Sequence, residues 1–333
     1  MTVTRTPSER ITLASLRTGA EKTRRQGRAK PAHWPSVGFL RPPHYAPLVR
    51  HDLPAPADLH LHSTFSDGTE PPTEVVARAA EAGLKTIALT DHDTVAGWDE
   101  AARATRAAGL VLIPGIEVSA KHRGRSVHVL AYLPDPNAPE LAGLMARVRD
   151  DRVGRAERIA RNIARDYPVS WDDVLAQRTG DATVGRPHIA DALIAAGVVA
   201  SREEAFAAIL HPAGPYYVGH DAPDPGEVVR AIGAAGGVSI IAHPAGRGML
   251  PDDVIRALIG DGLGGFELEH RENSAAGVAH LRGFVDQHDL IVTGSSDYHG
   301  IAGKPNRPGE NTTAPEMVER IVRAASGTDP VLP

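Results

Sequence analysis

The chain has 333 residues, 42% of them hydrophobic, and a formal net charge of −5. This length suits one large α/β domain with an insertion, or two domains, and the negative charge excludes a general nucleic-acid binder. Cysteine is absent, so any metal must be held by His, Asp and Glu. No apolar run approaches the ~20 residues of a membrane span, and the N-terminus lacks the apolar stretch of a secretory signal. We therefore expect a cytoplasmic protein with no membrane partner.

Residues 1–55 differ in composition from the rest of the chain. Eight Lys or Arg residues in the first 30 positions face only Glu9 and Glu21, and a Pro-rich stretch runs from Pro31 to Pro54. We interpret this segment as a flexible basic arm. It is either a disordered extension, or residues upstream of the true start codon, or an arm that gathers an anionic substrate.

From residue 58 onward, short apolar runs alternate with helical patterns. Strands are predicted at 58–62, 86–90, 110–118, 127–132, 237–243, 265–269 and 290–295. Helices are predicted at 73–82, 98–108, 227–235, 252–259, 275–288 and 316–325. Thr73 is the expected N-cap of the first helix, and Gly83 and Gly109 are the expected stops of the first two. The alternation predicts a parallel sheet covered by helices, closed or nearly closed into a barrel of about seven strands.

Residues 139–225 break this alternation. They are mostly helical in pattern, rich in Ala and Arg, and lack a strand-like run before residues 216–218. We predict that 139–225 form a helical subdomain inserted into a barrel domain of residues 56–333.

Nine metal-competent side chains fall at or near the ends of the predicted strands. His60 and His62 are two residues apart, so a strand points both imidazoles the same way. The other members are Asp67, His92, Glu117, His128, His243, Asp297 and His299. Strand ends of a barrel converge on one mouth, and burying so many polar groups without a cation would be costly. Nitrogen and oxygen ligands suit Zn, Mn and Fe, so the sequence predicts a cluster of divalent metal ions.

Several neighbouring residues have weaker assignments. Asp91 and Asp93 are candidates for orienting imidazoles, although a helix cap is the favoured role for Asp93. Arg123 and Arg125 are candidate phosphate ligands, but a solvated hairpin is the favoured interpretation. His270 follows a predicted strand end and could reach the mouth of the barrel.

Six segments resemble, in order, the motifs of the PHP (polymerase and histidinol phosphatase) family. They are DLHLHSTFSDG at 58–68, TDHD at 90–93, PGIEVS at 114–119, VHVL at 127–130, AHP at 242–244 and SDYH at 296–299. The match includes the place of the helical insertion, between the fourth strand and the His-Pro strand. The resemblance implies an α/β fold, a distorted seven-stranded (β/α) barrel, with a trinuclear metal site of Mn, Fe or Zn.

The resemblance also implies how the ligands are shared among three ions. One ion would be held by His60, His62, Glu117 and Asp297. A second would share Glu117 and add His128 and His243. The third would use Asp67, His92 and His299, with Asp67 standing where some relatives carry His.

Within the family, the insertion and the Ser-Asp-Gly form of the first motif are most similar to one branch. Its members hydrolyse nucleoside 3′,5′-bisphosphates and short RNA 5′ ends. Residues 185–188 (GRPH) resemble a basic motif with which this branch holds phosphate. Arg186 and His188 are therefore expected to bind substrate phosphate, or His188 to protonate the leaving oxygen. A helix start with a solvated Arg is the alternative.

The expected reaction is hydrolysis of phosphate monoesters or diesters of nucleotides by a metal-bridging hydroxide. The catalytic candidates are Asp67, His92, Glu117 and His299, with Glu117 joining two ions and the third ion binding phosphate oxygens. The expected substrate is a small phosphorylated nucleotide or a short RNA 5′ end, and no obligate protein partner is indicated.

Three alternatives stay open. The first is histidinol-phosphate phosphatase, which would need an acidic ammonium site, whereas the insertion is rich in Arg. The second is an amidohydrolase-type hydrolase, against which the Asp297-Tyr298-His299 sequence argues. The third is a non-catalytic metal-binding PHP module, which the complete ligand set disfavours.

Overall fold

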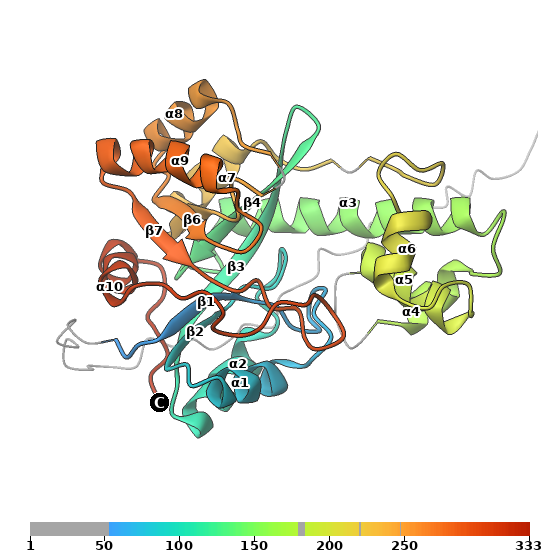
Figure 1. The fold of residues 1–333 in the computed structure, drawn as a ribbon, viewed down its shortest axis with the longest axis horizontal. Helices are drawn as coiled ribbons and strands as arrows, with labels where there is room; N and C mark the ends of the chain where they lie inside the picture. The colour runs from blue at the N-terminus through green and yellow to red at the C-terminus, as the bar shows by residue number, and fades with distance from the viewer. Residues whose placement is uncertain (1–52, 179–183, 220, 247) are drawn as a thin grey trace, which may run out of the picture. The chain divides into compact units, whose positions relative to one another are not determined.

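The computed structural model describes residues 53–178, 184–219, 221–246 and 248–333 (Figure 1). The predicted basic arm, except for its last three residues, lies outside this part of the chain. Within it, seven strands form one sheet whose spatial order follows the chain, β1-β2-β3-β4-β5-β6-β7. They are β1 (Ala57–Leu61), β2 (Thr86–Leu89), β3 (Val111–His122), β4 (Arg125–Tyr132), β5 (Val238–Ile241), β6 (Gly265–Glu269) and β7 (Ile291–Gly294).

The sheet closes almost completely between its two edges. Tyr298, just beyond β7, forms a parallel bridge with Leu61 at the end of β1. The backbone N–H of His62 donates to the carbonyl of Tyr298 at 2.9 Å. This contact brings the first and last motifs of the chain side by side, and it confirms the expected nearly closed barrel.

The expectation of an all-parallel sheet was wrong at β4. This strand runs antiparallel to both β3 and β5, whereas the other neighbouring pairs are parallel. The physical reason is the two-residue hairpin of Arg123 and Gly124, whose φ angles of 47° and 86° are those of a tight primed turn. Because β4 runs in the opposite direction, its first residues, and not its last, lie beside the motifs that follow the other strands.

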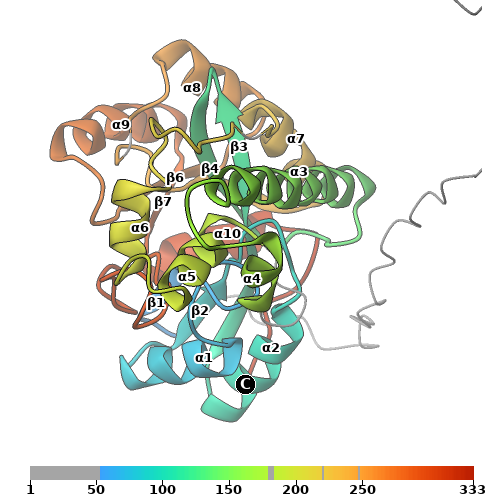
Figure 2. The same ribbon diagram turned by 90° about the vertical axis from the view of Figure 1, so that its right-hand side faces the viewer.

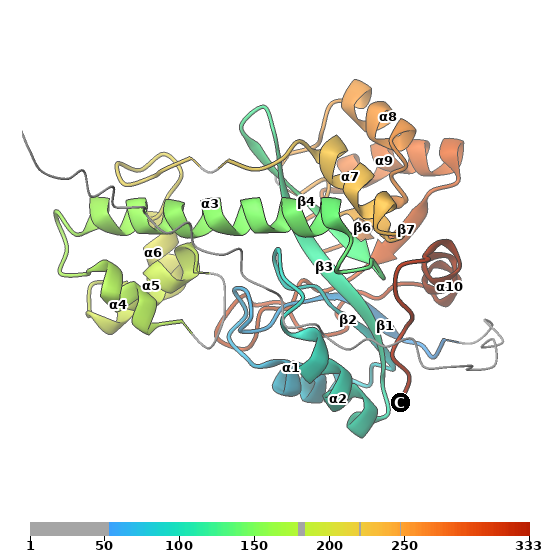
Figure 3. The same ribbon diagram turned by 180° about the vertical axis from the view of Figure 1, so that it is seen from behind.

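In the part of the chain that the structure describes, six helices pack around the barrel. α1 (Pro72–Glu81) and α2 (Trp98–Ala108) pack on each other, and α2 contacts β3. The others are α7 (Pro225–Ala234), α8 (Asp252–Gly260), α9 (Ala275–His288) and α10 (Pro315–Ala324). Figures 1 and 3 show α7, α8 and α9 on one side of the sheet and α1 and α2 on the other.

The expected helix ends were partly right. Gly109 ends α2 in a left-handed conformation, as predicted. Thr73 is not the N-cap of α1, because the helix begins one residue earlier and Pro71 occupies the cap position. Proline suits the first helical turn, and Pro72 therefore starts the helix. The hydroxyl of Thr73 instead donates to Glu100 of α2 at 2.8 Å.

Among the described residues between β4 and α7 there are four helices: α3 (Pro139–Ile163), α4 (Trp171–Ala176), α5 (Arg186–Ala195) and α6 (Arg202–Ala208). The first part of α3 packs on α7, and the rest extends to α4, α5 and α6 (Figures 1 and 2). This segment has its own apolar cluster, which includes Ile159, Ile163 and Leu193. Residues 216–218, which look strand-like in sequence, are not in a strand.

The barrel interior is aliphatic, as the composition indicates. Leu59, Ile113, Leu130 and Ile240 are fully buried in one cluster, together with Tyr132. The Tyr132 hydroxyl donates to the carbonyl of Leu59 at 3.0 Å, which satisfies its polar atom inside the core. Among the helices that the structure describes, none combines the length and the apolar character that crossing a membrane requires.

Candidate metal centre

The nine metal-competent side chains converge on one end of the barrel. Three sets of ligand atoms each lie within 4.8 Å of one another: His62, Asp67, His92 and His299; His60, His62, Glu117 and Asp297; and His92, Glu117 and His128. The ninth side chain, His243, places Nε2 3.4 Å from Glu117 Oε1. The three sets share His62, His92 and Glu117, so they form one continuous cluster.

Strand geometry explains why these residues meet. β3 continues past the end of β2, which stops at Leu89 opposite Pro114, so Glu117 projects beyond the neighbouring strand. His128 lies in the first half of β4, where the antiparallel direction turns it to the same end. His243 and Asp297 follow β5 and β7 with φ angles of 31° and 55°. Such conformations are unfavourable for residues with a Cβ, and they concentrate at functional sites.

Glu117 lies at the centre of the cluster. Its Oε2 lies 3.2 Å from His60 Nε2, 3.0 Å from His62 Nε2 and 3.3 Å from His92 Nδ1. Its Oε1 lies 2.6 Å from His128 Nδ1. One carboxylate, only 1% exposed, therefore connects imidazoles from β1, β4 and the loop after β2.

Several of these buried atoms have no hydrogen-bond partner among the described residues. They include His92 Nδ1, His128 Nδ1 and Glu117 Oε1. Burying a polar atom without a partner costs roughly 1–3 kcal/mol, and here several such atoms face one another. Lone pairs that converge on a shared space are typical of ligands around a cation. The donor set, imidazole nitrogens and carboxylate oxygens, thus fits divalent metal ions.

The carboxylates strongly favour positive charge at this place. Burial alone lowers the pKa of His60, but the charges of Glu267, Glu117 and Asp297 outweigh it and raise the pKa well above its usual range. Burial also opposes protonation of His62, yet contacts with Asp297 and Glu117 raise its pKa to about 9. The electrostatic field of the site therefore attracts cations, whether protons or metal ions.

Comparison with known proteins also indicates a metal-dependent enzyme. The PHP domain model matches residues 58–183. The chain is 33% identical to a 3′,5′-nucleoside bisphosphate phosphatase of Chromobacterium violaceum over 80% of this chain and 95% of the relative. The chain belongs to the PHP family. Its relatives in this family are phosphoesterases, and it carries the candidate metal centre described above. It is therefore a metal-dependent phosphoric ester hydrolase.

Other relatives act on different phosphate esters. A 5′-3′ exoribonuclease of Haemophilus influenzae is 34% identical over 74% of this chain and 90% of that protein. A phosphoribosyl 1,2-cyclic phosphate 1,2-diphosphodiesterase of Eggerthella lenta is 31% identical over 74% of this chain and 95% of that protein. Among solved structures, one assigned as a metal-dependent phosphoesterase from Bifidobacterium adolescentis is 42% identical, with a TM-score of 0.79, and covers 83% of this chain and 98% of that chain.

In this PHP barrel, a buried carboxylate that the sequence did not single out supports the ligands. Glu267 on β6 accepts from His60 Nδ1 at 2.9 Å and from the backbone N–H of His243 at 2.8 Å. Because Nδ1 of His60 donates to Glu267, its Nε2 lone pair points into the cluster. The sequence carries no local signal for this role, because strand alternation places Glu267 and Glu269, two residues apart, on the same face. An irregularity in the β6–β7 pairing between the two residues leaves Glu267 buried and Glu269 exposed.

The two aspartates beside His92 have different roles. Asp91 accepts from the Ser63 backbone and from Ser66 Oγ, both at 2.7 Å, and Ser66 Oγ lies 3.4 Å from His62 Nδ1. Asp91 thus orients an imidazole only through Ser66. Asp93 does not cap a helix, because α2 starts at residue 98 with a glycine N-cap. Its carboxylate instead accepts from the backbone N–H of Ser119 at 2.7 Å.

The two residues of the GRPH segment lie in different surroundings. His188 is buried, and its Nδ1 accepts from the backbone N–H of Gly185 at 3.2 Å. Burial lowers the pKa of His188, and its charge environment includes Asp67 of the cluster. Arg186 lies over the ring of Phe206, 5.3 Å from its centroid, and donates to the carbonyl of Leu210. These Arg186 contacts are internal to the insertion.

Two other cations of the insertion make contacts beside the cluster. Arg152 Nη2 donates to Asp93 Oδ2 at 2.8 Å and to Ser119 Oγ at 2.7 Å. Arg202 donates to the carbonyl of Asp67 at 3.2 Å. The sequence of the insertion is rich in Arg but carries no signal for Arg202 in particular, because its position depends on how the insertion folds back.

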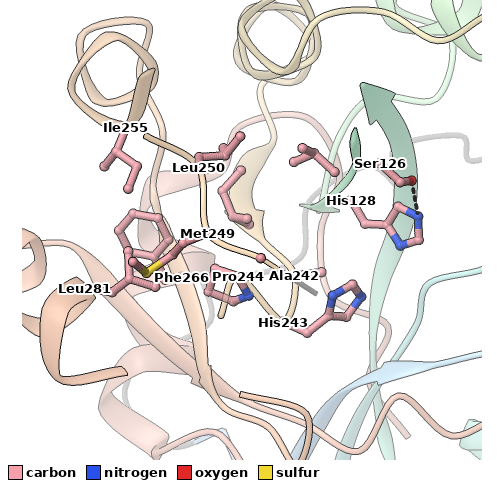
Figure 4. Close-up of a pocket in the computed structure, with 13 residues that line it drawn as sticks. Ser126, His128, Ala242, His243, Pro244, Met249, Leu250, Ile255, Phe266 and Leu281 are labelled. Atoms are coloured by element: carbon pink, nitrogen blue, oxygen red, sulfur yellow. Dashed lines mark hydrogen bonds between the residues drawn. The ribbon is translucent and has the colours of Figure 1, made fainter. Parts of the chain in front are cut away.

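Two weaker candidates from the sequence, His270 and Arg125, have different positions relative to the cluster. His270 does reach the cluster, with Nε2 3.9 Å from Asp297 Oδ2. Arg125 stays in the β3–β4 hairpin, where it donates to the carbonyl of Met249 at 2.7 Å. Beside that hairpin lies a pocket that has His128 and His243 on one side and apolar residues such as Leu250 on the other (Figure 4).

Proposed function

We propose that this PHP phosphoesterase acts on small phosphorylated nucleotides, namely nucleoside 3′,5′-bisphosphates or short 5′-phosphorylated RNA. The observation that carries the proposal is a nine-residue ligand cluster faced by cationic side chains of the insertion. A cluster alone suits any phosphate ester, whereas additional cations beside it suit a substrate with a second phosphate.

We assign the nine residues to as many as three divalent ions, of Mn, Fe or Zn. His60, His62, Glu117 and Asp297 would hold one ion; His128 and His243, with Glu117, a second; Asp67, His92 and His299 a third. When bound, such ions lower the pKa of water and neutralise charge on phosphoryl oxygens.

The chain's own residues keep these ligands in the required state. Nδ1 of His299 donates to the Asp297 carbonyl at 2.8 Å, so its Nε2 lone pair faces Asp67, 3.2 Å away. Asp67 is the most exposed of the three carboxylates among the nine residues, with 20% of its side chain exposed, against 1% for Glu117 and 2% for Asp297. We therefore place the substrate entrance on the Asp67 side, which the insertion faces.

We propose that His188, Arg152 and Arg202 bind the second phosphate or the leaving group. Burial lowers the pKa of His188, so its imidazole is neutral at pH 7. Since Nδ1 accepts a hydrogen bond from Gly185, the proton resides on Nε2, which is a donor for an anionic oxygen. For Arg186 the same role requires that it leave its position over Phe206.

Histidinol phosphate and a nucleotide with two phosphates would require different side chains around the substrate site. Histidinol phosphate carries an ammonium group and would need an unpaired carboxylate near the insertion. Asp191 of the insertion makes a bidentate pair with Arg202, at 2.7 and 2.6 Å. Asp191 is therefore not free for an ammonium group, and the contacts of Arg152 with Asp93 and of Arg202 with the Asp67 carbonyl support a polyanionic substrate.

The test is phosphate or nucleotide release by protein that has been stripped of metal and reloaded with Mn²⁺. The substrates are adenosine 3′,5′-bisphosphate, a 5′-phosphorylated RNA oligomer, phosphoribosyl 1,2-cyclic phosphate and histidinol phosphate. Release from the first two, lost in His60→Ala and Asp297→Ala but kept in His280→Ala, supports the proposal. His280 is a suitable control because it is 41% exposed and pairs with Asp252. Release only from the cyclic phosphate or from histidinol phosphate would refute the nucleotide assignment.

A further inference from the structure

Lys304 lies at the cluster although no motif includes it. Its Nζ is 2.5 Å from Oδ2 of Asp297. Its side chain is 32% exposed, whereas that of Asp297 is only 2% exposed. Lys304 therefore connects solvent with the buried ligands, in the place from which a dissolved substrate would approach.

The loop that carries Lys304 is held against the site. The Asn306 side chain donates to the carbonyl of Ser296 at 2.6 Å and to that of Asp297 at 3.3 Å. A Cβ on Gly303 would lie 2.3 Å from the carbonyl oxygen of His299, so only glycine permits this close approach. The position of Lys304 beside the cluster thus follows from the packing of its loop.

The two oxygens of Asp297 face different groups. Oδ1 lies 3.4 Å from His60 Nε2 and 3.3 Å from His62 Nε2, inside the cluster. Oδ2 faces Lys304 and, at 3.9 Å, His270 Nε2. A cation on the Oδ1 side and the ammonium on the Oδ2 side would therefore share one carboxylate.

The net charge of the site determines whether the Lys304 ammonium remains paired with Asp297 when metal ions are bound. The carboxylates of Asp67, Glu117, Glu267 and Asp297 lie in or directly against the cluster. Two divalent cations would already balance these four negative charges, and a third would exceed them. Lys304 would then be surplus positive charge next to metal ions, which is unfavourable unless an anion joins it.

We propose that Lys304 binds the phosphoryl oxygens of the substrate, exchanging Asp297 for phosphate when the metal ions are bound. The inference deepens the phosphoesterase function and rests on the metal site proposed above. An ammonium on a long, flexible side chain makes a strong charge-assisted hydrogen bond to phosphate. Gly300 and Gly303 flank the start of its loop, and the side chain needs to move only within the site.

A purely supporting role makes the opposite prediction for metal binding. If Lys304 served only to hold Asp297 in position, its removal would weaken metal affinity and leave phosphate affinity unchanged. If it binds phosphate, its removal weakens phosphate binding, while metal affinity stays equal or rises because a competing cation is gone.

The test uses the full chain reloaded with Mn²⁺, and inorganic phosphate as the probe. Lys304→Met, Lys304→Arg and Lys85→Met are compared by calorimetric titration of Mn²⁺ and of phosphate, and by KM and kcat. Lys85 is the control because it is exposed and begins the approach to β2. We expect Lys304→Met to weaken phosphate binding and raise KM roughly tenfold or more, Lys304→Arg to retain most affinity, and Lys85→Met to change neither.

Two results would overturn the proposal. Unchanged phosphate affinity in Lys304→Met, with or without weaker Mn²⁺ binding, would assign Lys304 to the support of Asp297. If the wild-type protein with bound Mn²⁺ neither binds phosphate nor hydrolyses any ester, the proposed function itself fails, and the inference with it. Melting curves show whether each variant is folded. If the methionine variant is not, Lys304→Gln, which removes the charge but keeps a polar side chain, tests the role by the same titrations.

Discussion

Nδ1 of His128 lies 2.6 Å from Oε1 of Glu117, yet in the described part of the chain neither atom makes a hydrogen bond. The two atoms are close enough to bond but are not oriented toward one another. Both atoms are competent metal ligands, and a divalent cation bound to both would satisfy them. This relationship joins β3 to β4 and places Glu117 between two of the proposed metal sites.

Replacing Glu117 with glutamine should disrupt more than one ion. An amide offers one neutral oxygen in place of two charged ones, so both metal sites that share this residue lose a ligand. We expect at least one ion fewer per chain by elemental analysis and a fall in kcat/KM of at least about 100-fold. Full metal content with normal activity would refute the central position of Glu117.

Glu267→Gln tests whether Glu267 orients the metal ligands His60 and His243 without itself binding metal. An amide offers one neutral acceptor oxygen, whereas the carboxylate accepts from both His60 Nδ1 and the His243 backbone N–H, so we expect metal affinity to fall about 10- to 100-fold. Glu269→Gln is the matched control, because Glu269 lies on the same strand, is 52% exposed and pairs with Arg282. Equal effects of the two substitutions on Mn²⁺ titrations would contradict this role.

Metal removal should lower thermal stability. Ions that bind only the folded state stabilise it by about 2.7 kcal/mol at a concentration 100 times Kd. We expect the melting temperature to fall with a chelator and to recover with added Mn²⁺. The His60→Ala variant should show a smaller recovery, whereas His280→Ala should behave like the wild type. A chelator that leaves the melting temperature unchanged would argue against metal ions that stabilise the folded protein.

His188 should titrate below the usual histidine range. Burial lowers its pKa, so the folded state binds fewer protons than the unfolded state at mildly acidic pH. Its contribution to stability is therefore present above the unfolded pKa of about 6.5 and is lost as pH falls through the folded pKa. NMR titration of its ring protons, together with pH-dependent unfolding of wild type and His188→Gln, measures this. A folded pKa at or above 6.5 would contradict the prediction.

The insertion should select for a second phosphate. Because Arg202 contacts the Asp67 loop and Arg186 lies over Phe206, Arg202→Met should raise KM for adenosine 3′,5′-bisphosphate about tenfold. KM for a simple monophosphate such as p-nitrophenyl phosphate should change less. Arg186→Met and the exposed Arg161→Met should have small effects on both. A larger effect of Arg186→Met than of Arg202→Met would assign the second phosphate to Arg186 instead of Arg202.

Local patterns were sufficient for most of the barrel and for the choice of ligand candidates. Apolar runs between helical patterns predicted seven strands, and the i, i+2 spacing of His60 and His62 predicted imidazoles on one side of β1. Gly109 marked the end of α2. These features depend on strand alternation, helix termination and side-chain chemistry, which act over a few residues.

Only the tertiary structure decided which distant groups meet. The direction of β4 depends on a tight hairpin and on pairing with β5, more than 100 residues away in sequence. Glu267, Arg202 and Lys304 reach the cluster through sheet closure, folding of the insertion and packing of a loop, none of which has a local signature. Asp93 bonds Ser119 instead of capping a helix for the same reason. The sequence by itself thus determined the ligand chemistry, whereas long-range packing determined the charges that surround it.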